Sequence, residues 1–389
     1  MVLSLEPNGR QVDKCLVLLY DKQMNIPSLA LAGSLLLNAC AKEETCTYYP
    51  EVENLNASGG KKILAVLAEN VESAPGFGFT SEEVTEALSE GSTYWSESSE
   101  GQMWISDAKV VGPYFTSELI QTNEAKNQLL EQVEDHDQVD FSDYDYVYYF
   151  HKTLTDAQYG YAEMSDYKTS TGENLVMPSV LVTLQDAGYM PLISAHEGLH
   201  YWLGHANFFD CGADTLTQNS DDCERVAYQN LTSYMGFGMD KELDLTQRLS
   251  IGWLAADELL QVKESGTYSI TPRYQGTPLT SEGAQVQRWA DSGEVLSSFQ
   301  VEWDPSYSAG LMFTMVDKTP IACDPENPLR EGNQNSNLLD MQPEEEEYED
   351  PSEKFTLNPG AEFVDPVTGM TIGGVEIQNG KIYFEVTYK

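Results

Sequence analysis

Residues 188–207 read GYMPLISAHEGLHYWLGHAN and contain three of the five histidines in this 389-residue chain. Pro191 suits the first turn of an α-helix, and residues 192–203 are predicted to continue that helix. Because positions four apart share one face of a helix, His196 and His200 can present two imidazoles to a single metal ion. The spacing therefore predicts a metal site on this helix.

Glu197 directly follows the first of these histidines. Zinc held by three protein ligands keeps a fourth position for water and lowers the pKa of that water to about 7. A carboxylate beside the water can accept its proton and later pass it to a leaving amine. The segment thus predicts a Zn²⁺-dependent hydrolase in which His196 and His200 are ligands and Glu197 is the general base and acid.

The third ligand is less directly specified. His205 lies nine residues after His196, which places it on the opposite face of a continuing helix. It can reach the same ion only if the helix stops and the chain turns back, and Gly204 permits such a turn. We therefore favour His205. The competing candidates are Asn207 and Asp210 in the same turn and Glu224, which would be the distal glutamate of a thermolysin-type site.

Other patterns up to residue 264 predict an α/β (α+β) catalytic domain over residues 61–264. A buried strand is expected at residues 62–67, and a helix over 80–94 should begin with a capping box formed by Thr80 and Glu83. Further strands are expected at 102–111 and 144–151, and further helices at 117–133 and 244–260.

Residues 265–389 are predicted to form an all-β sandwich domain. Short alternating segments at 267–273, 295–303, 310–317 and 381–388 are separated by Gly, Pro, Asn and Asp. This pattern is typical of antiparallel sheets rather than of more α/β chain. Residues 343–354 (PEEEEYEDPSEK) are predicted to form a solvated acidic loop.

Residues 1–41 are predicted to be a signal or leader segment, and residues 42–60 a linker. The apolar run at 26–37 fits the core of a signal peptide and is too short to span a bilayer. A secreted protein is therefore expected. Residues 37–40 also resemble a lipobox, so the alternative is a cell-surface lipoprotein anchored through Cys40. A third possibility is a buried N-terminal helix. No later segment is apolar enough to be transmembrane.

Four cysteines follow the leader, an even number that favours disulfides in an exported chain. Cys211 and Cys223 enclose a short polar segment and are the preferred pair. Cys46 and Cys323 would then pair by elimination. Because no Cys-x-x-Cys spacing occurs, metal binding by these cysteines is not expected.

The net charge of −42, from 63 acidic and 21 basic residues, argues against two kinds of partner. Nucleic acids and anionic membrane surfaces both require a basic face, which this chain lacks. The excess of carboxylates favours solubility and could also hold structural Ca²⁺.

These motifs together resemble the metzincin zinc peptidases. Residues 233–238 (SYMGFG) look like their Met-turn, in which Met235 would form the apolar floor beneath the metal. The sequence around these motifs is similar to the sequences of the secreted gametolysin and immune inhibitor A families. The similar segments are 94–102, 143–147, 250–254, 262–272, 338–341 and 357–372, so the resemblance runs from about residue 60 to the end.

The resemblance implies a secreted zinc endopeptidase whose substrates are proteins or peptides that add as a strand along the cleft edge. Those families place the glycine seven and the third ligand ten residues after the first His, whereas Gly204 is eight on and His205 nine. A one-residue deletion makes His205 the ligand, and a one-residue insertion puts Asn207 there. Two alternatives stay open: a catalytically inactive surface binding or adhesion protein on a metzincin scaffold, and a thermolysin-like hydrolase using Glu224.

Overall fold

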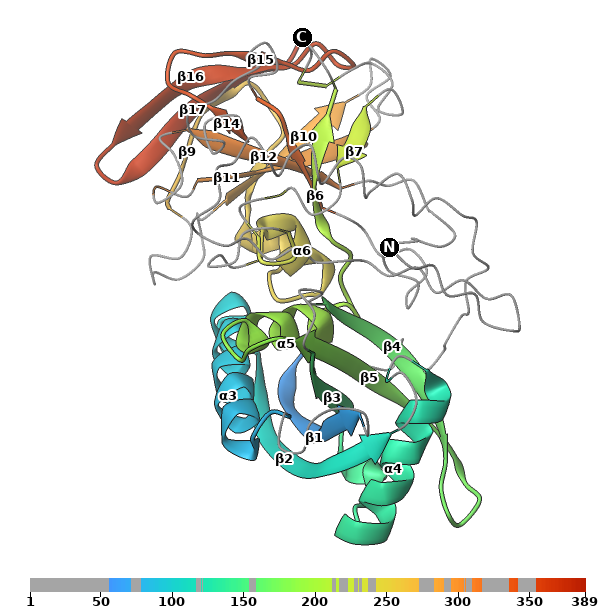
Figure 1. The fold of residues 1–389 in the computed structure, drawn as a ribbon. Helices are drawn as coiled ribbons and strands as arrows, with labels where there is room; N and C mark the ends of the chain where they lie inside the picture. The colour runs from blue at the N-terminus through green and yellow to red at the C-terminus, as the bar shows by residue number, and fades with distance from the viewer. Residues whose placement is uncertain are drawn as a thin grey trace. The chain divides into compact units, whose positions relative to one another are not determined.

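The computed structural model shows a mixed α/β protein with several sheets and few helices (Figure 1). The residues described are 56–70, 78–116, 120, 122–153, 159–211, 215–216, 223–226, 230, 233–236, 243–272, 283–289, 295–303, 305, 310–316, 336–341 and 355–389. Outside them lie the predicted leader, most of the predicted linker, the acidic loop, and Cys40, Cys46 and Cys323.

The described residues form two compact units, and the chain passes between them at several points, the last of which follows Gly198. The first unit comprises residues 60–92 and 105–198. The second comprises 54–59, 93–104 and residues from 199 onward. The domain boundary predicted at residue 265 stays a prediction.

The first unit is built on a five-stranded sheet with strand order β2-β1-β3-β5-β4. Strands β1, β3 and β5 are parallel, and β4 pairs antiparallel with β5 at one edge. The strands are β1 (Gly59–Asn70), β2 (Met103–Thr116), β3 (Tyr146–Lys152), β4 (Tyr159–Lys168) and β5 (Asn174–Leu184). The predicted strands at 62–67, 102–111 and 144–151 are thereby confirmed, whereas the β4–β5 hairpin was not predicted.

Helices cover both faces of this sheet (Figure 1). Alternate residues of β3 point to opposite faces. On one face Tyr149 joins a core with α4 (Asn123–Asp137), and on the other the hydroxyl of Tyr148 donates to the Ser194 carbonyl oxygen of α5 (Met190–Leu199) at 3.1 Å. The sheet therefore supports α5, which carries His196 and Glu197.

The predicted helix at 80–94 is α3 (Ser81–Ser98), and its capping box is confirmed. The Glu83 amide donates to Thr80 Oγ1 at 3.2 Å, and the Thr80 amide donates to the Glu83 carboxylate at 2.7 Å. These two bonds satisfy amide groups that a helix start would otherwise leave without partners.

Two helices have different bounds in the structure from those predicted. Helix α4 begins at Asn123 rather than at 117, because Thr122 caps it by accepting from the Ala125 amide. Helix α6 (Leu245–Ser250) begins as predicted after its N-cap Asp244 but ends ten residues early. Gly252 has a φ of 78°, the left-handed conformation that commonly terminates helices.

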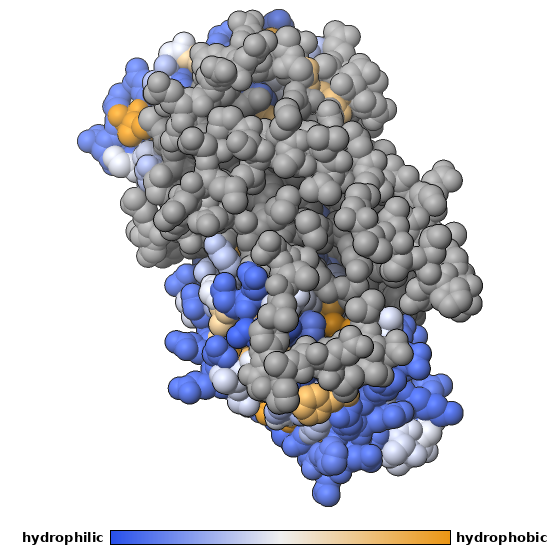
Figure 2. All heavy atoms as spheres, in the orientation of Figure 1, coloured by the Kyte–Doolittle hydropathy of each residue, from blue (hydrophilic) through white to orange (hydrophobic). Residues whose placement is uncertain are grey.

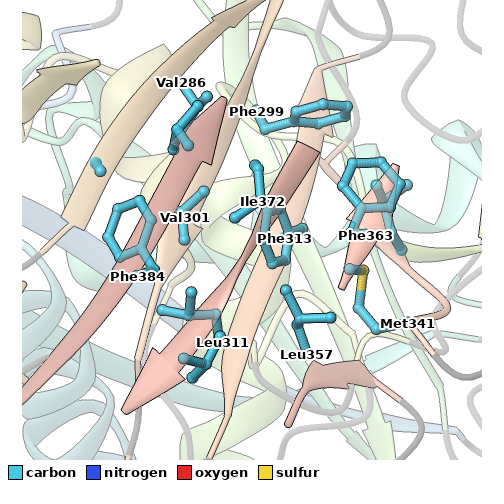
Figure 3. Packing of buried hydrophobic residues seen from close by; sticks show 14 of the residues in the cluster. Val286, Phe299, Val301, Leu311, Phe313, Met341, Leu357, Phe363, Ile372 and Phe384 are labelled. Carbon is cyan, nitrogen blue, oxygen red and sulfur yellow. The ribbon is translucent and has the colours of Figure 1, made fainter. Parts of the chain in front are cut away.

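The second unit contains two sheets that share one hydrophobic core (Figure 3). Phe299 and Phe313 come from the eight-stranded sheet, and Phe363 and Phe384 from the four-stranded sheet. This agrees with the expected β-sandwich, although the larger sheet also takes in three strands that precede residue 265. Its strands are β6 (Ala206–Asp210), β7 (Glu224–Val226), β8 (Leu260–Val262), β10 (Gly283–Trp289), β11 (Val295–Glu302), β12 (Leu311–Val316), β13 (Ser336–Leu339) and β14 (Thr356–Leu357).

The smaller sheet has the strand order β15-β16-β17-β9. These strands are β15 (Phe363–Val364), β16 (Thr371–Gln378), β17 (Lys381–Thr387) and β9 (Gly266–Ile270). The strand segments predicted at 267–273, 295–303, 310–317 and 381–388 correspond to β9, β11, β12 and β17. Their alternating pattern was sufficient because each buries one face in the shared core.

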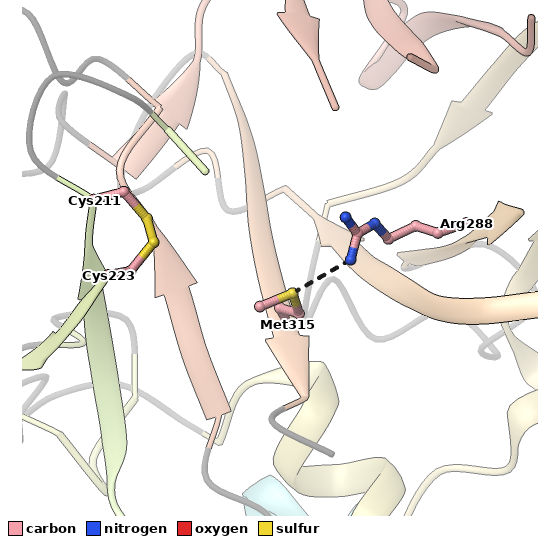
Figure 4. Close-up of a disulfide and its surroundings, with 4 residues drawn as sticks. All are labelled: Cys211, Cys223, Arg288 and Met315. Carbon is pink, nitrogen blue, oxygen red and sulfur yellow. Dashed lines mark hydrogen bonds between the residues drawn. A yellow bond between two sulfur atoms is a disulfide. The ribbon is translucent and has the colours of Figure 1, made fainter. Parts of the chain in front are cut away.

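The predicted disulfide between Cys211 and Cys223 is confirmed (Figure 4). It lies beside the sandwich core, where Cys211 is buried. The bond joins the end of β6 to the start of β7, two paired strands of the larger sheet. Closing this short loop restricts the unfolded chain and thereby stabilises the fold.

A buried ion pair joins the two sheets of the second unit. Arg288 donates to both carboxylate oxygens of Asp365, at 2.7 and 2.9 Å, and its guanidinium lies over the Phe299 ring. Burial raises the pKa of Asp365, but hydrogen bonds from Arg288, Thr368 and Val367 outweigh that effect and hold the pKa below its ordinary value. The carboxylate is therefore stabilised in its charged form.

Asp365→Asn is expected to lower the free energy of unfolding by about 3–5 kcal/mol at neutral pH, because it leaves Arg288 buried without an opposite charge. The folded pKa lies below the unfolded value of about 3.9. The contribution is therefore complete above that pH and is lost as the pH falls through the folded pKa. Urea unfolding of both proteins at pH 7 and pH 3 checks this. Equal midpoints at pH 7 would contradict it.

The described surface of the first unit is predominantly hydrophilic in the view of Figure 2. This agrees with the large excess of acidic side chains in the chain. Among the residues that the structure describes, no helix is both long and apolar enough to span a membrane.

Candidate metal centre

Helix α5 is held in place by its neighbours in the first unit. Pro191 lies in its first turn, as predicted. A Cβ added at Gly91 would lie 3.3 Å from the Pro191 carbonyl oxygen, so α3 and α5 approach closely. Together with the Tyr148 bond to Ser194, this contact positions the last turn of α5, where His196 lies.

The three histidines of the motif come together. His196, His200 and His205 are all buried, and one ligand atom from each lies within 4.8 Å of the others. Among the described His, Cys, Asp and Glu side chains, these three form the group that could hold a metal ion. The prediction that the chain brings His205 back beside the other two is confirmed.

The chain achieves this because α5 ends at Leu199, four residues earlier than predicted. The Leu199 carbonyl oxygen accepts from the amides of both Trp202 and Leu203 at 2.9 Å, which closes a turn. His200 therefore lies just beyond the helix rather than within it. A continuing helix would have carried His205 to the opposite side.

The orientation of His200 suits a metal ligand. Its Nδ1 lies 3.2 Å from the Leu203 carbonyl oxygen, which can only accept a hydrogen bond. Nδ1 is therefore the protonated nitrogen, and Nε2 keeps its lone pair for a metal. The ring of His200 meets that of His205 edge-on, with centroids 4.6 Å apart.

The segment around His205 is bracketed by backbone hydrogen bonds. The Ala206 amide donates to the Met235 carbonyl oxygen at 2.9 Å, and the Ala206 carbonyl oxygen accepts from the Asn230 amide at 3.3 Å. Met235 is fully buried, and a Cβ at Gly236 would lie 2.2 Å from the Asn230 carbonyl oxygen. The turn at 233–236 thus contacts the ligand segment directly and requires glycine.

The residues present fit a zinc ion. Three neutral imidazoles are a known ligand set for zinc with one open position. In tetrahedral coordination at 2.0–2.1 Å their nitrogens would be about 3.4 Å apart, so a group already within 4.8 Å needs only small side-chain movements. Burial of all three favours a precise site over a loose surface one.

Glu197 is 3% exposed, and burial raises its pKa to about 8. The cause is loss of water around the charged form. A cation held by the neighbouring histidines would oppose this shift by favouring the carboxylate. The side chain also lies against β4, because a Cβ at Gly160 would be only 2.5 Å from Glu197 Cγ.

The other candidate ligands lie on two strands of the larger sheet. Asn207 is buried on β6, where its backbone is in register with Asn337 of β13. Asp210 and Glu224 lie opposite each other on β6 and β7. The sequence alone did not exclude these residues as the third metal ligand in place of His205. Among the described side chains, His205 is the one that the structure brings to the other two histidines.

Gly160 is a residue of this site that the sequence reasoning missed. It lies 37 positions from Glu197 in an unpredicted strand, and no local motif marks it.

Comparison with known proteins adds no assignment, since no family model matches this chain and no curated protein matches its sequence. The candidate centre is therefore defined by its own residues.

Proposed function

We propose that this protein is a zinc-dependent endopeptidase with a metzincin-like catalytic domain. The observation that carries the proposal is the buried group of His196, His200 and His205, with Glu197 in the same turn of α5 as the first ligand. Three imidazoles and an adjacent carboxylate are the parts that hydrolysis of a peptide bond by an activated water requires.

Each residue has a separate role in this proposal. The three histidines hold the ion, which when bound supplies Lewis acidity and lowers the pKa of water. Glu197 accepts the proton of the attacking water and then delivers it to the nitrogen of the leaving amine. The buried setting strengthens these electrostatic effects, because few water molecules screen the charges. Met235 supports the segment that carries His205.

Strand β4 is the best candidate for the surface that aligns a substrate. Among the described strands it lies at the edge of the five-stranded sheet, so one side of its backbone can pair with an added strand. Its Gly160 lies against Glu197, which brings this strand next to the proposed base. A peptide paired along β4 would have its backbone held in extended form beside the carboxylate.

The cellular setting is also part of the proposal. The Cys211–Cys223 disulfide is consistent with export to an oxidising compartment. We propose a secreted enzyme acting on proteins or peptides, with a lipid anchor at Cys40 as the alternative. A structural Ca²⁺ bound by acidic residues stays a prediction.

Removing the metal tests the proposal. Purified protein is expected to contain about one zinc per chain and to cleave an unfolded protein substrate. Dialysis against a chelator is expected to abolish cleavage, and stoichiometric zinc to restore it. Metal content by mass spectrometry and product analysis on gels measure both effects.

Cleavage that persists after complete zinc removal would contradict the proposal. Bound zinc without cleavage of any unfolded substrate would instead support the inactive binding protein, the rival suggested by the irregular ligand spacing. A protein without zinc under any loading condition would exclude both zinc hydrolase assignments.

A further inference from the structure

A buried polar network lies at the start of α6 in the second unit. Its side chains are those of Asn230, Ser233, Asp244 and Gln247, none of which is more than 1% exposed. Asp244 accepts from the Gln247 amide at 2.9 Å as the helix N-cap, and its other oxygen accepts from Asn230 Nδ2 at 3.1 Å. The first turn of α6 is thereby tied to Asn230.

Gln247 extends this network in two directions. Its Oε1 accepts from Ser233 Oγ at 2.6 Å, and its Nε2 donates to the Gly204 carbonyl oxygen at 3.5 Å. Because a carbonyl oxygen can only accept, the amide orientation is defined by the Gly204 contact. One side chain therefore links the turn that carries Met235 to the residue just before His205.

The network holds the His205 segment from both sides. Gln247 contacts Gly204 on one side, and on the other side Ala206 bonds to Met235 and Asn230 through the backbone. Ser233 Oγ also accepts from the Met235 amide at 3.2 Å, which couples the turn to the same glutamine. Gly204 and Ala206, the neighbours of His205, are thus both connected through hydrogen bonds to Asp244 or Gln247.

This concentration of buried polar groups calls for a physical explanation. Buried amides and carboxylates cost free energy unless they are hydrogen-bonded, so an apolar helix start would stabilise the fold more simply. A polar network instead specifies one arrangement of the segments that it joins. Groups that orient metal ligands commonly change metal affinity by 10–100-fold when removed.

We propose that Gln247, held by the N-cap Asp244, is a positioning residue that places His205 for metal binding. This inference rests on the proposed zinc site and adds the mechanism by which its third ligand is held. Gln247 acts through Gly204 and Ser233 and has no proposed contact with substrate.

Two variants separate the bonds of Gln247, and a third provides a control. Gln247→Ala removes both bonds, and Gln247→Glu keeps an acceptor for Ser233 but loses the donor to Gly204. The matched control is Thr246→Val, the neighbouring residue of α6, which is equally buried and loses a 2.8 Å bond to Thr314 on β12. Each is compared with the wild type for zinc affinity by chelator competition and for the absorption spectrum of bound Co²⁺.

Gln247→Ala is expected to weaken zinc binding about 10–100-fold and to alter the Co²⁺ spectrum. Gln247→Glu should fall between that variant and the wild type, and Thr246→Val should leave both readouts unchanged. Equal losses in Gln247→Ala and Thr246→Val would overturn the inference, since both would then reflect general destabilisation.

Hydrogen exchange at the Ala206 amide provides a readout that needs no metal. Gln247→Ala is expected to accelerate this exchange at least 10-fold relative to Thr246→Val, because the bond to Met235 is loosened. Unchanged exchange would overturn the inference even if zinc binds. Accelerated exchange in a chain that binds no zinc would support the positioning role while refuting the proposed peptidase, so the two failures are distinguishable.

Discussion

Substituting Glu197 by glutamine is expected to lower kcat/KM for peptide cleavage about 10²–10⁴-fold while zinc remains bound. Glutamine has nearly the same shape, so it can occupy the same buried space against Gly160. It has no basic oxygen to take the proton of the attacking water. The loss is therefore expected in the chemical step, with the ligand set intact.

The measurement compares initial rates on one unfolded protein substrate with zinc content determined on the same samples. Glu131→Gln provides a control, because it makes the same chemical change at an exposed position on α4. The control is expected to keep wild-type activity and zinc. Unchanged cleavage in the Glu197 variant would refute its role as base, and loss of zinc would indicate a structural role.

His205→Ala is expected to weaken zinc binding by more than about 100-fold, the upper end of the effect of removing a residue that only orients a ligand. His205 supplies one of three imidazoles in the buried group, and alanine offers no donor atom. Two histidines and water would have to hold the ion. Activity is expected to fall with the loss of metal.

Glu224→Gln distinguishes the competing ligand scheme. If His205 is the third ligand, this variant should retain zinc affinity within about twofold of the wild type, since Glu224 then contributes no ligand atom. Retention of zinc by His205→Ala together with its loss in Glu224→Gln would establish the thermolysin-type alternative. Chelator competition at matched pH measures both variants.

Local sequence signals predicted much of the secondary structure. The Thr80 and Glu83 pair predicted the start of α3, and Pro191 predicted the start of α5. Alternating segments located β9, β11, β12 and β17. These predictions succeeded because helix caps, and the alternation of side chains along a strand, depend on residues close together in the chain.

Helix ends and the β4–β5 hairpin were predicted less well. Helix α5 ends at Leu199 and α6 at Ser250, although apolar residues continue beyond both. Those later residues are buried by other elements of the fold, so periodicity alone could not show where each helix stops. Residues 169–173 (TSTGE) form the turn between β4 and β5, and this turn signal was overlooked in the prediction.

The sequence by itself determined which side chains could form the metal centre: two histidines at helical spacing, an adjacent glutamate, and a third histidine after a glycine. Only the tertiary structure decided that His205 joins them, that Gly160 lies against Glu197, and that Gln247 reaches Gly204. The physical reason is distance along the chain. Spacing within one helix is set by its geometry, whereas contacts between remote segments depend on how the strands, turns and helices pack.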